Sequence, residues 1–270
     1  MLKRFTAEWN SWEFISKAIT FYASLEKDLG QDVLHPKAIN RILSSVEEQN
    51  NWMVASDKEV LSRFISSEIL NNNNTAIHAS FGLGAVQEAK TMKPFAVLQR
   101  YQAFLKQHHQ FVQESFVYER LVVSQQGVQY KDIVAKKVVF AEGAGVVHNP
   151  YFTIDISPKG KNVFVGNKGE YIIIKAPLLQ SEAILKGPVM VIPLGDDLYK
   201  VGASYGRDDF SLHPTQEASK DISDKLKKMI SCDFELVDQV AGIRPTVKDR
   251  KPLIGCIQEA KTLSFLNGLG

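Results

Sequence analysis

The feature that most constrains the fold is the order in which helical and strand-type hydrophobic patterns follow one another. Apolar residues recur at three- and four-residue steps in three stretches, which are predicted to be amphipathic helices: residues 12–29, 94–109 and 215–230. Roughly ten short runs rich in β-branched and aromatic residues are predicted strands. These runs are residues 38–45, 111–118, 120–124, 128–133, 137–141, 169–174, 190–193, 198–203, 234–243, 253–257 and 263–266. Because helices and strands do not alternate as repeated βαβ units would, the pattern predicts an α+β fold with a large antiparallel or mixed sheet.

Capping and turn residues mark several of the predicted boundaries. Ser11 is placed to cap the first helix and Gly30 follows its end, while Pro94 stands in the first turn of the second helix. A short helix is expected at residues 49–56, after the first strand. The predicted turns are residues 71–74, 125–127 and 195–197.

Composition excludes several classes of protein. Apolar residues make up 44% of the chain and charged residues 23%, as in globular domains rather than disordered or fibrous chains. With 32 basic and 30 acidic side chains the net charge is +2, which gives no reason to expect nucleic acid as a partner. The longest apolar runs, such as residues 188–193, are too short to span a membrane, and no secretory signal opens the chain, so a cytoplasmic location is expected.

Motifs for metal and phosphate binding are missing from the sequence. It contains no HExxH, CxxC or Walker-type phosphate loop, and no metal site is expected. The two cysteines, Cys232 and Cys256, are 24 positions apart, which fits neither a disulfide framework nor a metal site. Both are expected to be buried thiols.

Three segments stand out because a strand pattern runs directly into small or charged residues. Residues 137–145 end in Gly143-Ala144-Gly145, where the backbone is free of bulky side chains that would keep a ligand away. A tight turn at the end of a strand explains these small residues equally well. Residues 241–255 place Arg244 at the end of a strand, and residues 263–270 open into a glycine-rich turn.

In this order the three segments resemble the FAD-dependent oxidoreductases of the D-amino-acid oxidase superfamily, which includes glycine oxidase and sarcosine oxidase. The strongest matches are residues 242–245, 251–255 and 267–270. The resemblance implies FAD as the cofactor and an amine or amino acid as the small-molecule substrate. It implies oxidation by hydride transfer from a substrate carbon to the flavin, with no catalytic side chain required.

The resemblance also implies site residues. Arg244 would hold the substrate carboxylate; the alternative is that Arg244 pairs with Asp249 or a backbone carbonyl. Tyr205 would contact the substrate; the alternative is a packing aromatic. The residues implied to contact the flavin or its adenine are Phe116, Val117, Ala141, Gly143, Ala144, Asn267, Gly268, Leu269 and Gly270.

By the same resemblance the fold divides into two parts. A substrate-binding domain with a mixed or antiparallel sheet and helices would take residues 1–90 and 151–244, and an incomplete α/β FAD-binding domain residues 91–150 and 245–270. The family's N-terminal dinucleotide-binding unit and C-terminal helix have no counterpart, which predicts an internal fragment and leaves FAD binding by these residues open. Exposed strand edges would then favour a dimer, a swapped oligomer or disordered segments.

Two other functions fit the same residues. One is a ligand-binding or interaction domain that keeps the fold without redox chemistry. The other is a flavin domain joined to a second activity such as RNA modification, for which the net charge of +2 gives no support.

Overall fold

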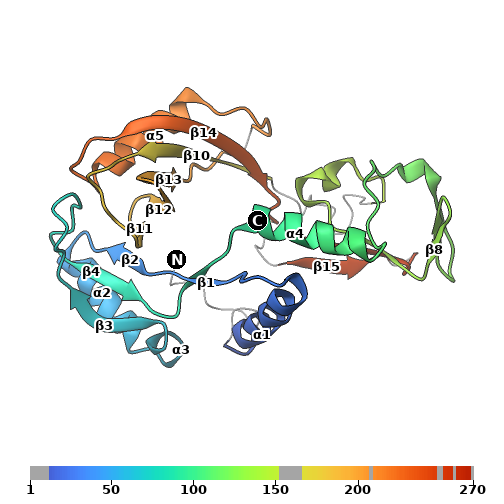
Figure 1. Ribbon diagram of the computed structural model, residues 1–270, viewed down its shortest axis with the longest axis horizontal. Coiled ribbons are helices and arrows are strands. Elements are labelled where there is room, and N and C mark those ends of the chain that lie inside the picture. The colour runs from blue at the N-terminus through green and yellow to red at the C-terminus, as the bar shows by residue number, and fades with distance from the viewer. Residues whose placement is uncertain (1–11, 152–165, 207–208, 248–251, 258–259, 269–270) are drawn as a thin grey trace. The chain divides into compact units, whose positions relative to one another are not determined.

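The computed structural model describes residues 12–151, 166–206, 209–247, 252–257 and 260–268, and its helices and strands are drawn in Figure 1. The α-helices are α1 (Trp12–Leu29), α2 (Val46–Ser56), α3 (Glu59–Ser62), α4 (Pro94–Gln107) and α5 (Gln216–Lys227). Two 3₁₀ helices also occur among the described residues, η3 (Tyr118–Arg120) and η4 (Gly143–His148).

The largest sheet in the described part of the chain has eight strands. Their order across the sheet is β14 (Glu235–Arg244), β10 (Asn167–Lys175), β13 (Leu198–Gly202), β12 (Met190–Gly195), β11 (Ile184–Lys186), β2 (Ile39–Ile42), β4 (Leu83–Val86) and β3 (Ile65–Leu70). The pair β11–β2 is parallel, whereas β11–β12, β12–β13, β2–β4 and β3–β4 are antiparallel. The sheet is therefore mixed, and the predicted α+β class is confirmed.

Three smaller sheets complete the described strands. They are the pair β1 (His35–Pro36) and β5 (Lys90–Thr91), the meander β6 (Leu121–Val123), β7 (Val128–Tyr130) and β8 (Ile133–Ala135), and the sheet β15 (Leu253–Cys256), β16 (Leu263–Asn267) and β9 (Val138–Phe140). In the last sheet β16 pairs parallel with β9 and antiparallel with β15.

The chain divides into two compact units. The first unit comprises residues 1–113, 172–202 and 220–238, and the second comprises residues 114–171, 203–219 and 239–270. Strands β10 and β14 each contribute residues to both units. The roles expected for a substrate domain and an FAD domain stay predictions.

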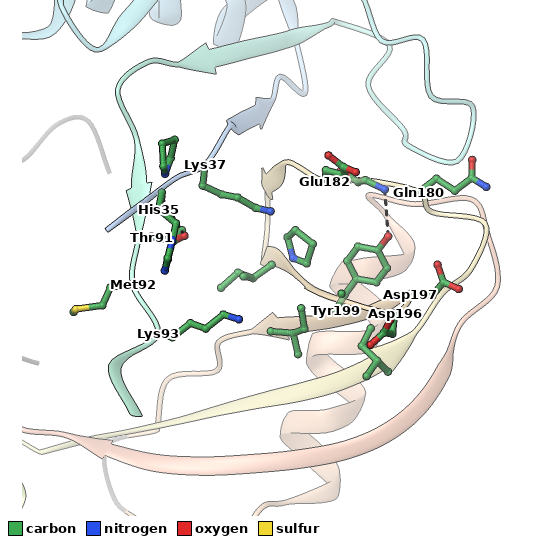
Figure 2. Close-up of a pocket in the computed structure, with 17 residues that line it drawn as sticks. His35, Lys37, Thr91, Met92, Lys93, Gln180, Glu182, Asp196, Asp197 and Tyr199 are labelled. Carbon is green, nitrogen blue, oxygen red and sulfur yellow. Dashed lines mark hydrogen bonds between the residues drawn. The ribbon is translucent and has the colours of Figure 1, made fainter. Parts of the chain in front are cut away.

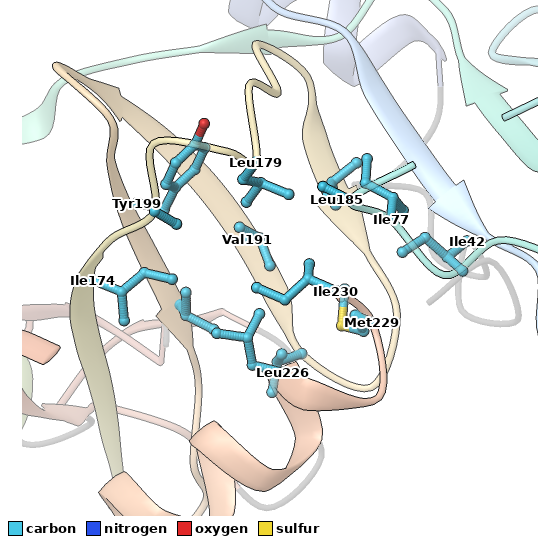
Figure 3. Packing of buried hydrophobic residues seen from close by; sticks show 14 of the residues in the cluster. Ile42, Ile77, Ile174, Leu179, Leu185, Val191, Tyr199, Leu226, Met229 and Ile230 are labelled. Carbon is cyan, nitrogen blue, oxygen red and sulfur yellow. The ribbon is translucent and has the colours of Figure 1, made fainter. Parts of the chain in front are cut away.

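The core of the first unit forms where α5 packs on the large sheet (Figure 3). Ile222 and Leu226, one helical turn apart, are fully buried, as the periodicity predicted. They meet Ile172 and Ile174 of β10, which alternate with less buried residues along the strand. Burying each such side chain contributes roughly 1.5–3 kcal/mol, so this layer is a main source of the unit's stability.

Local signals explain the predictions that hold. Helix α1 begins and ends as expected, with Gly30 in the left-handed region at φ 64°, although Ser11 lies outside the described residues. Helix α4 starts at Pro94, and the predicted turn at 125–127 closes a hairpin through a hydrogen bond from Ser124 N to Gly127 O of 2.9 Å. The turn at 195–197 likewise joins β12 to β13.

Three sequence predictions were wrong. Helix α2 begins at Val46 rather than near residue 49, because Ser45 caps it by accepting a hydrogen bond from Glu48 N at 3.1 Å. Residues 111–117 form no strand; there Val117 N donates to the Tyr130 hydroxyl at 3.1 Å instead of to a neighbouring strand. Cys256 is exposed, because β15 is largely open to solvent, and Cys232 is only half-buried, at the margin of the first unit's core.

Several strands were missed. Strands β1, β5 and β11 have two or three residues each, which is too few to show a period of two. Strand β3 has the sequence Ile-Ser-Ser-Glu-Ile-Leu, and its middle residues are mostly exposed. Its polar centre carries no strand signal.

Candidate functional site

Arg244 and Tyr205, the two residues predicted to bind substrate, lie together in the second unit. Arg244 is the last residue of β14, and its Nη1 donates to Asn167 Oδ1 at the start of β10, at 3.0 Å. Its Cζ atom lies 5.0 Å from the centroid of the Tyr205 ring, within the range of a cation–π contact. Asn167 and Tyr205 therefore hold the guanidinium from two sides.

Gly169 makes this position of the arginine possible. A Cβ atom built on Gly169 would overlap Nη2, Cζ and Nη1 of Arg244, so the guanidinium lies directly against the β10 backbone. An isolated glycine inside a strand is a known sign of such close approach. The sequence carried that sign, but nothing in it named Arg244 as the partner.

The electrostatic setting of Arg244 suits an anionic ligand. Among the described residues no carboxylate forms a salt bridge with it, and its side-chain partner Asn167 is neutral. Asp249, the alternative partner considered from the sequence, lies outside the described residues. Tyr205 is 78% exposed, so its ring is available at the surface rather than packed in a core.

The opposite face of β10 carries a buried charged network that sequence reasoning missed. Lys168 and Glu170 are 2% and 3% exposed, and Lys168 Nζ lies 3.7 Å from Glu170 Oε1. Lys168 Nζ also pairs with Asp209 Oδ2 at 2.5 Å. Hydrogen bonds from Lys168 and from Ser211 hold the pKa of Asp209 at about 2, below its usual value. The signal in the sequence was a lysine and a glutamate two residues apart within a strand run.

A second cluster of predicted residues forms where the parallel strands β9 and β16 end. Asn267 Nδ2 donates to Gly143 O at 2.8 Å, and Gly268 N donates to Asn267 Oδ1 at 2.8 Å. Gly143 and Gly268 both lie in the left-handed region, with φ 57° and 76°. Ligands of α/β sheets bind beyond the carboxyl ends of parallel strands, which is where these residues meet.

The space at Gly143 fits a cofactor that approaches the backbone. Of the described residues, a Cβ atom built there would meet only Pro245, at its Cγ atom 3.9 Å away, so these residues leave room beside the backbone. Ala144 is half-buried against the core of the second unit, whereas Ala141 is exposed. Leu269 and Gly270, also predicted to touch the flavin, lie outside the described residues.

Phe116 and Val117, predicted to meet the adenine, flank an aromatic cluster. Phe116 stacks on Tyr130 with centroids 4.3 Å apart and meets Phe140 edge-on, and both Phe116 and Val117 are 37% exposed. Beside them the Tyr118 hydroxyl donates to Glu142 Oε1 at 2.5 Å. Burial, together with this bond to a carboxylate, raises the pKa of Tyr118 to about 12.

The first unit holds a separate cavity of about 710 Å³ next to β1, β5 and the β12–β13 hairpin. Figure 2 shows Lys37 and Lys93 reaching into it from one side, with Glu182, Asp196 and Asp197 on the other. None of the residues predicted for substrate or cofactor lines it. The candidate site is therefore the Arg244 cluster and the β9–β16 strand ends of the second unit.

The described residues contain no group of three or more histidine, cysteine, aspartate or glutamate side chains placed to hold a metal ion. None of the helices among them is both long and apolar enough to cross a membrane.

The sequence matches a protein-family model over nearly its whole length. Residues 4–270 match the family described as FAD dependent oxidoreductase. The chain belongs to this family, and FAD is the family's cofactor.

Solved structures of oxidases and of a dehydrogenase share the fold. The L-proline dehydrogenase of P. horikoshii superposes with a TM-score of 0.77 at 15% identity, covering 98% of this chain and 75% of that one. For the iminodiacetate oxidase of Chelativorans sp. the TM-score is 0.72 at 13% identity, with 98% and 76% covered. For the glycine oxidase of Geobacillus kaustophilus it is 0.68 at 16% identity, with 94% and 71% covered. At these identities the similarity concerns the fold.

Proposed function

We propose that this protein oxidises an amino acid or a related amine that carries a carboxylate, and that Arg244 binds that carboxylate. The observation that carries the proposal is the guanidinium held between Asn167 and Tyr205 with no carboxylate partner among the described residues. A planar guanidinium offers a carboxylate two parallel charge-assisted hydrogen bonds. Two of the enzymes with this fold are named for amino-acid substrates, glycine and L-proline.

The residues of the site act by binding and orienting. Arg244 fixes one end of the substrate, and the Tyr205 ring covers the guanidinium and limits the directions from which a carboxylate can reach it. In the reaction the substrate Cα–H bond breaks, its electron pair leaves as hydride, and the amine nitrogen forms a double bond to that carbon and loses a proton. When bound, FAD supplies the acceptor of the hydride.

The residues that would hold FAD are those at the β9–β16 strand ends. Gly143 and Gly268 let a ring lie close to the backbone, and the Asn267 side chain joins the two strand ends. Ala141 and Ala144 belong to the same segment. Leu269 and Gly270 continue from Gly268, and Phe116 and Val117 are proposed for the adenine.

The test first asks whether the protein binds flavin and then which compounds reduce the bound flavin. The visible spectrum of the purified protein, before and after incubation with FAD, reports whether flavin is bound. Anaerobic addition of single amino acids and of the amines that lack the carboxylate then reports flavin bleaching. We expect bleaching by a carboxylate-bearing amine, with KM raised about a hundredfold in Arg244→Met and less in Arg244→Lys. Equal bleaching by the matching amine without a carboxylate would overturn the proposal, and failure to bind flavin would favour a ligand-binding domain without redox chemistry.

A further inference from the structure

Strand β10 presents two different surfaces in the second unit. Asn167 and Gly169 face the Arg244 guanidinium, and since side chains alternate along a strand, Lys168 and Glu170 face the other way. Both of these charged side chains are almost fully buried. Residues 167–170 therefore have two faces: the one next to Arg244, called the substrate face below, and the opposite one, which carries the buried charged network.

The Lys168 ammonium group fixes the segment that follows Tyr205. Its Nζ donates to Asp209 Oδ2 at 2.5 Å, to Ser211 Oγ at 3.2 Å and to His213 O at 2.6 Å. Its backbone forms two hydrogen bonds with Gly206, Lys168 N to Gly206 O and Gly206 N to Lys168 O, both of 2.8 Å. Tyr205 directly precedes Gly206, so main-chain bonds hold the chain beside Tyr205, and the ammonium group holds residues 209, 211 and 213 further along.

Glu170 fixes the strand that carries Arg244. Its carboxylate accepts hydrogen bonds from Thr215 N at 2.7 Å, Thr215 Oγ1 at 2.9 Å and Gln239 Nε2 at 2.9 Å. Gln239 lies on β14, five residues before Arg244. The two buried charges thus connect β10 to both elements that shape the substrate face.

We propose that Lys168 is a positioning residue, whose ammonium group holds the Tyr205 segment so that the tyrosine ring covers the Arg244 guanidinium. An apolar residue would avoid the free-energy cost of burying an ammonium ion but would supply none of its three directed hydrogen bonds. The inference rests on the proposed function, because Tyr205 matters to catalysis only if Arg244 binds the substrate.

The test compares Lys168→Met with a matched control in the FAD-loaded protein. Lys225→Met removes an exposed lysine of α5, in the first unit, that pairs with Asp221 at 2.6 Å. In Lys168→Met we expect faster hydrogen exchange at the Tyr205 and Gly206 amides and a KM raised about tenfold, with kcat changed less than about twofold. In the control we expect neither change. If Lys168→Met fails to fold, Asp209→Ala removes the shortest of the three side-chain contacts at a half-exposed position, and the same shifts are expected in smaller size.

The outcomes separate the two proposals. Wild-type exchange at Tyr205 and wild-type KM in Lys168→Met, with KM raised in Arg244→Met, would overturn the positioning role and leave the proposed function intact. Faster exchange with an unchanged KM would also overturn it. An unchanged KM in Arg244→Met would overturn the proposed function itself, whatever Lys168→Met does.

Discussion

The contact between Gly169 and Arg244 gives the sharpest test of the candidate site. In Gly169→Ala the new methyl group occupies the place of the guanidinium. Ordinary van der Waals contact begins near 3.4 Å, so the guanidinium must retreat by about 1 Å, a shift large enough to disrupt a productive geometry. The loss of a bidentate charge-assisted contact is worth about 3 kcal/mol, which is about a hundredfold in kcat/KM.

The fold itself should tolerate this change. Gly169 does not lie in the left-handed region, so alanine fits its backbone, and replacing glycine restricts the unfolded chain. The matched control is Gly255→Ala on β15, where a Cβ atom meets no described residue within 4 Å. We expect the control to keep the wild-type kcat/KM and both variants to unfold close to the wild-type midpoint.

The assay combines steady-state kinetics with calorimetric titration of propionate, a carboxylate without an oxidisable amine. Both the kcat/KM and the propionate affinity are expected to fall in Gly169→Ala. In the double variant Gly169→Ala with Arg244→Met the second substitution should add almost nothing, because Gly169 acts through Arg244. A wild-type affinity for propionate in Gly169→Ala, or fully additive losses in the double variant, would refute the reasoning.

Two further predictions concern stability. The pKa of Tyr118 is raised from 10.0 to about 12, so the folded state favours the protonated phenol. The free energy of unfolding should therefore fall as pH rises from about 10 to about 12. Urea titrations should show a weaker fall in Tyr118→Phe. An equal fall in both proteins would contradict the Tyr118–Glu142 assignment. Leu226→Ala should lower the free energy of unfolding by about 3 kcal/mol, whereas Leu178→Ala, at a residue 70% exposed, should change it by less than about 0.5 kcal/mol. Similar urea midpoints for these two variants would show that α5 does not anchor the core.

The helices were predictable because their signals are local. The apolar spacing of α5 places Ile222 and Leu226 on one side, and Pro94 marks the start of α4, whatever the rest of the chain does. Strands such as β11 depend instead on neighbours far along the chain: its Leu185 pairs with Val191 on one side and Asn40 on the other. A three-residue run cannot show such pairing in its own sequence.

The site was predictable only in part, for a related reason. Resemblance pointed to Arg244 and Tyr205, which lie together, and to Gly143 and Asn267, which are joined by a hydrogen bond. It did not point to Asn167, whose neutral side chain holds the guanidinium without cancelling its charge. The choice between an amide and a carboxylate partner decides whether an arginine can bind an anion, and that choice depends on the tertiary fold.

Residues 167–170 show why a pattern of polar residues misleads. The sequence Asn-Lys-Gly-Glu at the start of the predicted strand suggests exposed side chains, since polar residues usually lie in solvent. In the fold, Lys168, Gly169 and Glu170 are buried, because Arg244 covers one face of the strand while Asp209, Thr215 and Gln239 supply partners on the other. A buried charge persists only where such partners converge, and they come from segments 41 to 69 residues away. The same convergence that buries the lysine and the glutamate brings Tyr205 and Arg244 together, so the buried charged network of β10 and its proposed substrate face arise from one set of long-range contacts.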